Sequence, residues 1–451
     1  MRIYRFLHVK QSFIKIYSQK TILYLNDLFQ LRIYHQKLTN FFYLINSSWI
    51  LQHPISNMNL LPNSKPSSRY QHHTFILKAF KNSQLLKYPK LTELYFNPTS
   101  HIYLDPRAFT KLCNGLKTLK SLNVLYLNFS YTKELDDQSL RELSLALRQL
   151  HGLTILSLNF KQNRKITAKG ITELLKTVKN NRFLIKLYLD FSECGEVEET
   201  QLEPIYDSIS SMKLLTSFHL NHFHIPLLPT FGEKLANNLV KLRRLHYMKD
   251  FSINFTLWHG LKTLEILALS KVLRRMVRLY KLSLNSIGSI MFSKESMESF
   301  VNSLKSLPKL QKLHLHFLSS NTNQDCFDLT YKAFENSLTL SHLILDFSCA
   351  HVTSSATKNL LISLQTLKNL SKLELNFSNC LHSNNDVIQL LSQGISNLTN
   401  LSSLKLNFSK CPLTISSEKN LRRYSIETFF ALNRKKSKIK ISILHLFVDV
   451  F

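Results

Sequence analysis

Tyrosine, histidine and lysine side chains recur at two fixed positions of a repeating segment, and these residue types suit the recognition of another macromolecule. Tyrosine offers amphipathic contact area, whereas the lysine ammonium group pairs with carboxylates or phosphates. No glycine-rich phosphate-binding loop and no His-Glu-x-x-His motif occurs, so we predict binding without catalysis, bound metal or cofactor. The residues predicted to contact a partner are Tyr95, Tyr126, Tyr188, His219, His314, Lys186, Lys281, Lys312, Lys372 and Lys405.

The spacing of apolar residues predicts short strands that hold these side chains on one face of a sheet. Each segment opens on an apolar residue, and the residues three and five positions later are also apolar, which is the alternation of a half-buried strand. Counting from the opening residue, positions +2, +4 and +6 then point away from the core. The openings are Leu91, Leu122, Leu153, Leu184, Leu215, Met248, Leu279, Leu310, Leu340, Leu370, Leu401 and Ile441.

Between the strands the apolar spacing becomes helical. Ile171, Leu174, Leu175 and Val178 follow the i, i+3, i+4, i+7 spacing of an amphipathic helix, as does the stripe at positions 360, 361, 364 and 367. Polar residues able to cap a helix precede such stripes, at Thr167, Ser293 and Asn385. Each segment of about thirty-one residues is therefore predicted to hold a strand, a turn, a helix and a return loop.

Two further positions recur and favour a structural interpretation. Phenylalanine is frequent at position +7, where stacked rings would extend the core. Cys194, Cys380 and Cys411 all fall at position +10, so we interpret them as small buried turn residues and not as metal ligands or disulfide partners.

Position +6 is nearly constant, and constancy from segment to segment also favours structure. Its amides and carboxylates are predicted to hydrogen-bond to one another or to the adjoining turn, with direct contact to a ligand as the alternative. The row comprises Asn97, Asn128, Asn159, Asp190, Asn221, Asn254, Asn285, His316, Asp346, Asn376 and Asn407.

The Leu-x-x-Leu-x-Leu core, the polar or Cys turn and the following helix together resemble the leucine-rich repeat. The repeat length and full helix are similar to the ribonuclease-inhibitor-like subclass, and the Leu-Asn-Phe-Ser ending is similar to the long repeats common in ciliates. The resemblance implies an α/β solenoid, a curved horseshoe of about 12 repeats with a parallel concave sheet and outer helices. It also implies protein recognition on the concave face and no catalysis. The glycine usual before the helix survives only at Gly170.

The first 75 residues lie outside this repeat and are strongly basic. We predict a partly disordered or helical extension over residues 1–75, and a solenoid with a C-terminal cap strand over residues 76–451. Residues 1–92 hold thirteen of the Lys and Arg residues and one acid, Asp27, in a chain of formal net charge +29. Such a balance favours acidic protein, nucleic acid or anionic membrane as a partner. No apolar run is long enough to span a bilayer.

These observations support two hypotheses of function. The first is a non-enzymatic scaffold that binds a protein partner, expected to be acidic, on the concave face. The alternative is a basic structural component of a ribonucleoprotein or other nucleic-acid assembly. We expect an intracellular protein, cytoplasmic in the first instance. The basic residues in positions 1–26 leave mitochondrial targeting open, and a nuclear location and the oligomeric state are likewise left open.

Overall fold

The computed structural model describes residues 22–26, 90–97, 106–195, 199–221, 229–255, 263–285, 293–316, 331–335, 337–350, 352–380, 401–409, 411 and 440–444, with isolated positions between 387 and 400. The chain divides into two units, residues 1–195 and 196–451. Most of the predicted extension, the targeting segment apart from residues 22–26, and the predicted cap Asn385 lie outside the described residues.

The first unit alternates strands and helices. Its strands are β1 (Ile22–Asn26), β2 (Glu93–Asn97), β3 (Val124–Asn128), β4 (Ile155–Asn159) and β5 (Lys186–Asp190). Its helices are α4 (Pro106–Leu116), α5 (Asp137–Leu147) and α6 (Ala168–Val178). Each strand pairs in parallel with the next along the chain.

The second unit continues the same alternation. Its strands are β6 (Ser217–Asn221), β7 (Asp250–Asn254), β8 (Lys281–Asn285), β9 (Lys312–His316), β10 (His342–Asp346), β11 (Lys372–Asn376), β12 (Ser403–Asn407) and β13 (Lys440–Leu444). Its helices are α7 (Glu199–Ser211), α8 (Pro229–Leu239), α9 (Thr263–Leu273), α10 (Lys294–Lys305) and α12 (Ser354–Gln365), with a short 3-10 helix, η3 (Val240–Arg244). Pairing from β6 to β13 is again parallel and sequential.

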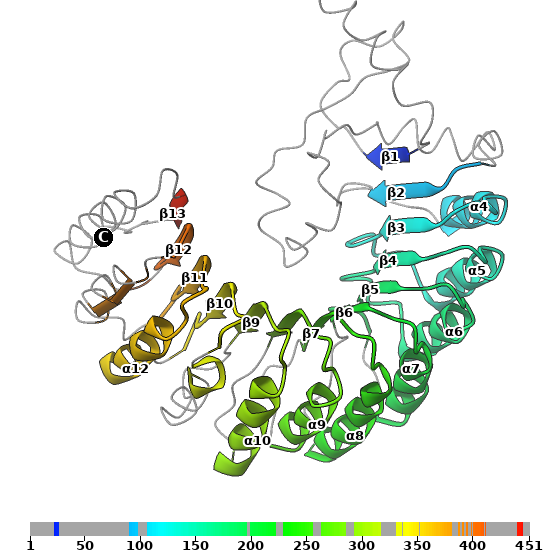
Figure 1. Ribbon diagram of the computed structural model, residues 1–451. Helices are drawn as coiled ribbons and strands as arrows, with labels where there is room; N and C mark the ends of the chain where they lie inside the picture. Colours follow the sequence, from blue (N-terminus) through cyan, green and yellow to red (C-terminus); the bar gives the residue numbers. More distant parts are fainter. Residues whose placement is uncertain are drawn as a thin grey trace, which may run out of the picture. The chain divides into compact units, whose positions relative to one another are not determined.

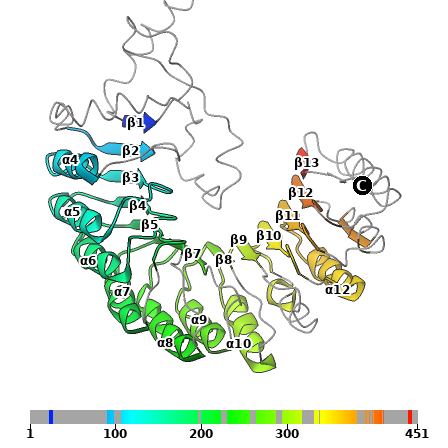
Figure 2. The same cartoon turned by 180° about the vertical axis from the view of Figure 1, so that it is seen from behind.

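Within each unit the sheet has a helix-covered face and an inner face. In Figures 1 and 2 the strands of a unit lie side by side, and its helices all cover the same side of the sheet. From β2 to β12 each strand spans positions +2 to +6, and positions +3 and +5 are buried throughout. Leu125, Leu156 and Leu187 lie in one register row and are at most 1% exposed. The predicted alternation is therefore confirmed.

The helices form where the apolar stripes predict them. In α6, Ile171, Leu174, Leu175 and Val178 are all buried, and Thr167 caps the helix by accepting a hydrogen bond from the amide of Lys169 at 3.2 Å. Ser293 caps α10 in the same way. None of the helices in the described part of the chain is long and apolar enough to cross a bilayer.

Gly170 has a different role from the one expected for it. It lies inside α6 and not before it, and a Cβ added there would stand 2.9 Å from the Cα of Asp137, at the start of α5. The glycine therefore allows two neighbouring helices to approach closely at their first turns.

Two strands differ from the sequence prediction. Ile441 pairs with Leu404, so it occupies position +3 of the last strand and not the opening position, an error of three residues. The true opening position is Lys438, which is not apolar, so the apolar pattern gives no sign of the opening there. In addition, Ile22–Asn26 forms β1 beside β2, inside the segment expected to lack the repeat. The domain boundary at residue 75 remains a prediction.

Candidate partner-binding surface

The inner face of each unit carries the side chains at positions +2, +4 and +6. Most of these side chains are half-buried, because neighbouring strands crowd them without covering them. Position +2 lies nearest the edge at which the strands begin, and position +6 nearest the edge at which they end. We call these the strand-start edge and the strand-end edge.

An aromatic pair dominates the inner face of the first unit. The rings of Tyr95 and Tyr126 stack with centroids 4.7 Å apart and an interplanar angle of 11°. Tyr95 also donates a hydrogen bond to Glu93, with 3.3 Å between the oxygens. Tyr188, predicted to continue this strip, is only 9% exposed, and Ser157 stands between it and Tyr126 in the register. The structure thus brings together two of the three tyrosines.

Basic residues occupy position +2 on four consecutive strands of the second unit. Lys281, Lys312, His342 and Lys372 are register neighbours on β8 to β11. Burial, together with the charges of Lys372 and Lys312, lowers the pKa of His342 to about 4. His342 is therefore neutral at pH 7, and its neutrality limits repulsion within the row.

Two predicted contact residues hold a carboxylate of the sheet. Asp250 Oδ2 lies 3.1 Å from His219 Nε2 and 3.5 Å from Lys281 Nζ. Burial alone would raise the pKa of Asp250, but the hydrogen bond from His219 and the charge of Lys281 lower it below its usual value. Burial also lowers the pKa of Lys281 despite the nearby carboxylate. His219 and Lys281 therefore stabilise the sheet as well as facing the inner surface.

The remaining predicted contact residues differ in how far their side chains are free to contact a partner. His314 Nδ1 lies 3.1 Å from Ser283 Oγ, and burial lowers the pKa of His314 to about 4 although Asp346 opposes that shift. Lys405 pairs with Glu374 at 3.2 Å. Lys372 is exposed, whereas Lys186 is half-buried.

Position +6 is structural, as its constancy predicts. The side chains of Asn128, Asn159, Asp190, Asp346, Asn376 and Asn407 each accept a hydrogen bond from the backbone amide two residues later, at 2.9–3.0 Å. Such a contact closes the turn after the strand. The side-chain amides also bond to the preceding strand: Asn128 donates to Asn97 at 2.6 Å, and Asn376 donates to Asp346 at 2.9 Å.

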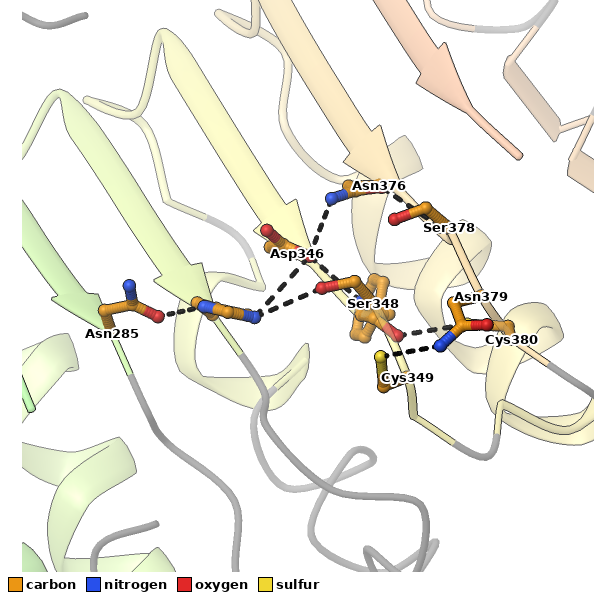
Figure 3. A network of polar contacts seen from close by, with 10 residues as sticks. Asn285, Asp346, Ser348, Cys349, Asn376, Ser378, Asn379 and Cys380 are labelled. Carbon is orange, nitrogen blue, oxygen red and sulfur yellow. Dashed lines mark hydrogen bonds and ion pairs between the residues drawn. The ribbon is translucent and has the colours of Figure 1, made fainter. Parts of the chain in front are cut away.

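Figure 3 shows this network at the ends of β8, β10 and β11, where Asn285, Asp346 and Asn376 lie at the strand ends. His316 replaces the amide on β9. Its Nδ1 contacts Asn285, and its Nε2 lies 3.2 Å from Ser348 Oγ. Burial lowers the pKa of His316, so the ring is held as a neutral hydrogen-bonding group.

Position +10 completes the strand-end edge. The thiols of Cys194, Cys380 and Cys411 lie 2.9–3.1 Å from the carbonyl oxygen of the position +7 phenylalanine in the preceding repeat. In the first unit Asn163 donates to the carbonyls of Phe129 and Phe160, both at 2.8 Å. The prediction of small buried turn residues is confirmed for Cys194 and Cys380, whereas Cys411 is half-buried, and all three thiols link successive repeats.

The structure also shows residues that the sequence reasoning missed. Phe183 is 63% exposed in the first unit, and in the second unit Leu214, Tyr247, Val277 and Leu338 are 57%, 45%, 51% and 70% exposed. Each lies one or two residues before a strand-opening residue, at the strand-start edge. Their apolar character at otherwise polar positions is visible in the sequence, although they precede the strands and stand outside the alternation that defines the inner face.

The repeated strand, turn and helix, with parallel strands and a laddered turn, define an α/β leucine-rich-repeat solenoid. No protein-family model and no curated protein matches the chain. One structural match is a chain from the crystal structure of the Rad7 and Elc1 complex in yeast. The match has 16% sequence identity and a TM-score of 0.39, and it covers 76% of this chain and 84% of that chain. This similarity is too low to support an assignment, so the fold class rests on the chain's own architecture.

Proposed function

We propose that this protein is a non-enzymatic scaffold that binds a protein partner on the inner, concave face of its solenoid. The observation that carries the proposal is the contrast between rows of the same face. Position +6 is nearly constant and its side chains close turns, whereas positions +2 and +4 change from repeat to repeat and are mostly half-buried. Residues that vary on a constant framework are the expected carriers of specificity in a repeat protein.

The residue types at positions +2 and +4 favour an acidic protein partner that also makes apolar or aromatic contacts. The stacked pair Tyr95 and Tyr126 presents a preorganised aromatic surface of the kind enriched at binding hot spots. In the second unit Lys312 and Lys372 flank the neutral His342 and would pair with carboxylates. Lys186, Lys405, His219 and His314 are proposed as supporting contacts.

The proposed absence of catalysis has a physical basis at the Ser283–His314 contact. A hydroxyl hydrogen-bonded to an imidazole is the arrangement of an activated nucleophile. Burial, however, lowers the pKa of His314 to about 4, so its ring is a weak general base at neutral pH. We therefore assign this contact to the cohesion of β8 and β9.

Two finer assignments belong to the proposal. Helices of 11 to 13 residues in most described repeats support the ribonuclease-inhibitor-like subclass. The division into a basic extension over residues 1–75 and a solenoid over residues 76–451 is supported by charge and by the repeat. Intracellular residence remains a prediction from the sequence.

Affinity purification of the tagged full chain tests the proposal. Partners should persist after nuclease treatment, and capture should fall about tenfold in Tyr126→Ala and in the pair Lys312→Gln with Lys372→Gln. Leu145→Ala, which changes an exposed residue on the outer helix α5, is the matched control and should retain capture. Unchanged capture in both variants would contradict binding on the inner face. Loss of all partners with nuclease would instead favour the ribonucleoprotein alternative.

A further inference from the structure

The strand-start edge of the second unit is a continuous surface made by successive helix-to-strand connections. Backbone hydrogen bonds join neighbouring connections side by side. The amides of Lys249, Tyr280, Gln311 and Ser341 donate to the carbonyls of Thr216, Lys249, Tyr280 and Gln311, at 2.7–2.9 Å. Side chains at the same position of successive repeats therefore lie next to one another along this edge.

The edge is strongly basic. Three consecutive connections, taken as residues 240–250, 271–281 and 302–312, hold twelve Lys and Arg residues and one acid, Asp250. Arg244, Arg274, Arg275, Arg278 and Lys309 are all exposed.

Helix dipoles account for only part of this charge. Basic residues near a helix C-terminus interact favourably with the macrodipole. The corresponding connections of the first unit, residues 114–124, 145–155 and 176–186, hold seven Lys and Arg residues and no acid. The excess in the second unit is therefore not explained by helix termini, which both units possess.

Exposed apolar side chains stand among these cations. Leu214, Tyr247, Val277 and Leu338 project from four different repeats, each one or two residues before the buried residue that opens a strand. Arg278 lies over the ring of Tyr247, with Cζ 5.1 Å from the centroid, and Lys312 lies over Tyr280 at 5.4 Å. Each projecting apolar group belongs to its own repeat, and the ring of Tyr247 lies beside positive charge.

We propose that this edge of the second unit docks onto the surface of an anionic lipid bilayer. Lysine and arginine would pair with acidic headgroups, while the projecting leucines, valine and tyrosines would enter the boundary between headgroups and acyl chains. A nucleic acid would use the same cations but would give Leu214, Val277 and Leu338 no role. A protein hot spot would gather its apolar groups in one packed patch, whereas these are distributed along the edge.

The inference goes beyond the proposed scaffold, because the edge extends past the inner face, although Lys281 and Lys312 at position +2 belong to both. Docking by the edge would leave positions +4 and +6 of the same repeats available. The protein would then hold its partner at a membrane surface, without a membrane-spanning segment being required.

Site-directed tryptophan fluorescence tests the contact at a single position of the full chain. Val277→Trp places the reporter at the edge, and Ile362→Trp places it at an exposed position of the outer helix α12 as the matched control. The natural Trp49 and Trp258 are common to both. Brominated phosphatidylcholine vesicles containing phosphatidylserine should quench the Val277→Trp signal at least twofold more than the control. Equal quenching in the two variants would overturn the proposal.

Vesicle co-sedimentation separates the possible partners. The charge variant Arg244→Gln, Arg275→Gln, Arg278→Gln should lower vesicle affinity about tenfold or more. The apolar variant Leu214→Ser, Val277→Ser, Leu338→Ser should lower it severalfold at the same net charge. The charge control Lys117→Gln, Lys120→Gln, Lys169→Gln removes as many cations from the first unit and should have a smaller effect. An apolar variant that binds vesicles like the parent, or a charge variant that loses a single-stranded oligouridylate instead of vesicles, would contradict membrane docking.

Discussion

The two edges of the same sheet are built from different kinds of residue. At the strand-end edge, asparagine and cysteine recur at fixed positions and hydrogen-bond to the neighbouring repeat, and recurring phenylalanine rings stack on one another. At the strand-start edge, the residues change from glycine and serine to leucine, tyrosine and arginine while the backbone ladder stays the same. In this protein, side chains bond neighbouring repeats at both edges, but the residue types vary more at the strand-start edge.

The largest effect expected from this comparison is the loss of a stacked phenylalanine. Phe160 is fully buried between Phe129 and Phe191, with ring centroids 5.6 and 6.0 Å away. Phe160→Ala should lower the free energy of unfolding by about 3–5 kcal/mol, because it leaves a cavity in the core. Urea unfolding followed by circular dichroism measures this. Leu338→Ala, at the strand-start edge, should lower the free energy of unfolding by less than about 0.5 kcal/mol. Equal losses in the two variants would contradict the difference between the two edges.

A somewhat smaller loss of stability is expected when the hydrogen-bonded turn residue at position +10 is replaced. Asn163 is fully buried, donates to two backbone carbonyls and accepts from Thr132 Oγ1 at 2.6 Å. Asn163→Ala should lower the free energy of unfolding by about 2–3 kcal/mol, because those buried groups lose their partner. Asn163→Cys should recover part of the loss, since cysteine fills the same position in other repeats. No difference between the two variants would argue against a bonding role at position +10.

The neutral histidine on β9 predicts a pH dependence of stability. The pKa of His314 is about 4 in the folded chain, below its ordinary value of 6.5, so the unfolded chain binds the proton more readily. Stability contributed by this group is therefore complete above about pH 6.5 and falls as the pH drops toward 4, by about 3 kcal/mol. Unfolding free energies measured across this window should show a shallower slope in His314→Gln. An unchanged slope would mean that His314 does not titrate differently on folding.

The smallest effect concerns chemical accessibility and leaves stability unchanged. Cys349 is exposed, whereas Cys194 is buried, and burial raises the pKa of the Cys194 thiol to about 12. Iodoacetamide should therefore label Cys349 in the native chain at pH 8 and leave Cys194 unmodified until the chain is unfolded. Peptide mass spectrometry identifies the labelled residues. Rapid native labelling of Cys194 would show that the strand-end edge opens readily.

The sequence predicted the strands, helices and buried turn residues because the repeat makes each assignment many times. Alternation at positions +3 and +5 and the helical stripe of α6 determine which residues face the core. The same redundancy identified the thiols at position +10 as structural. A single irregular repeat offers no such support, which is why the register of β13 was wrong by three residues.

The surface was less predictable, because exposure depends on what neighbouring repeats contribute. Tyr188 has the same position as Tyr126 but is nearly covered, and sequence alone gives no measure of that crowding. The ion pairs of Asp250 with His219 and Lys281 join three separate repeats. The exposed apolar side chains at the strand-start edge precede the strands, so the strand pattern does not predict them.

Amide hydrogen exchange tests most directly whether successive repeats stack upon one another. The amides of Phe160 and Phe377 lie beyond the ends of β4 and β11, and each donates to a carbonyl of the following repeat, at 2.8 and 2.7 Å. These amides should exchange about a thousandfold more slowly than in an unstructured peptide, because exchange requires neighbouring repeats to separate. Exchange within about tenfold of the peptide rate at both positions would contradict the solenoid and both surfaces derived from it.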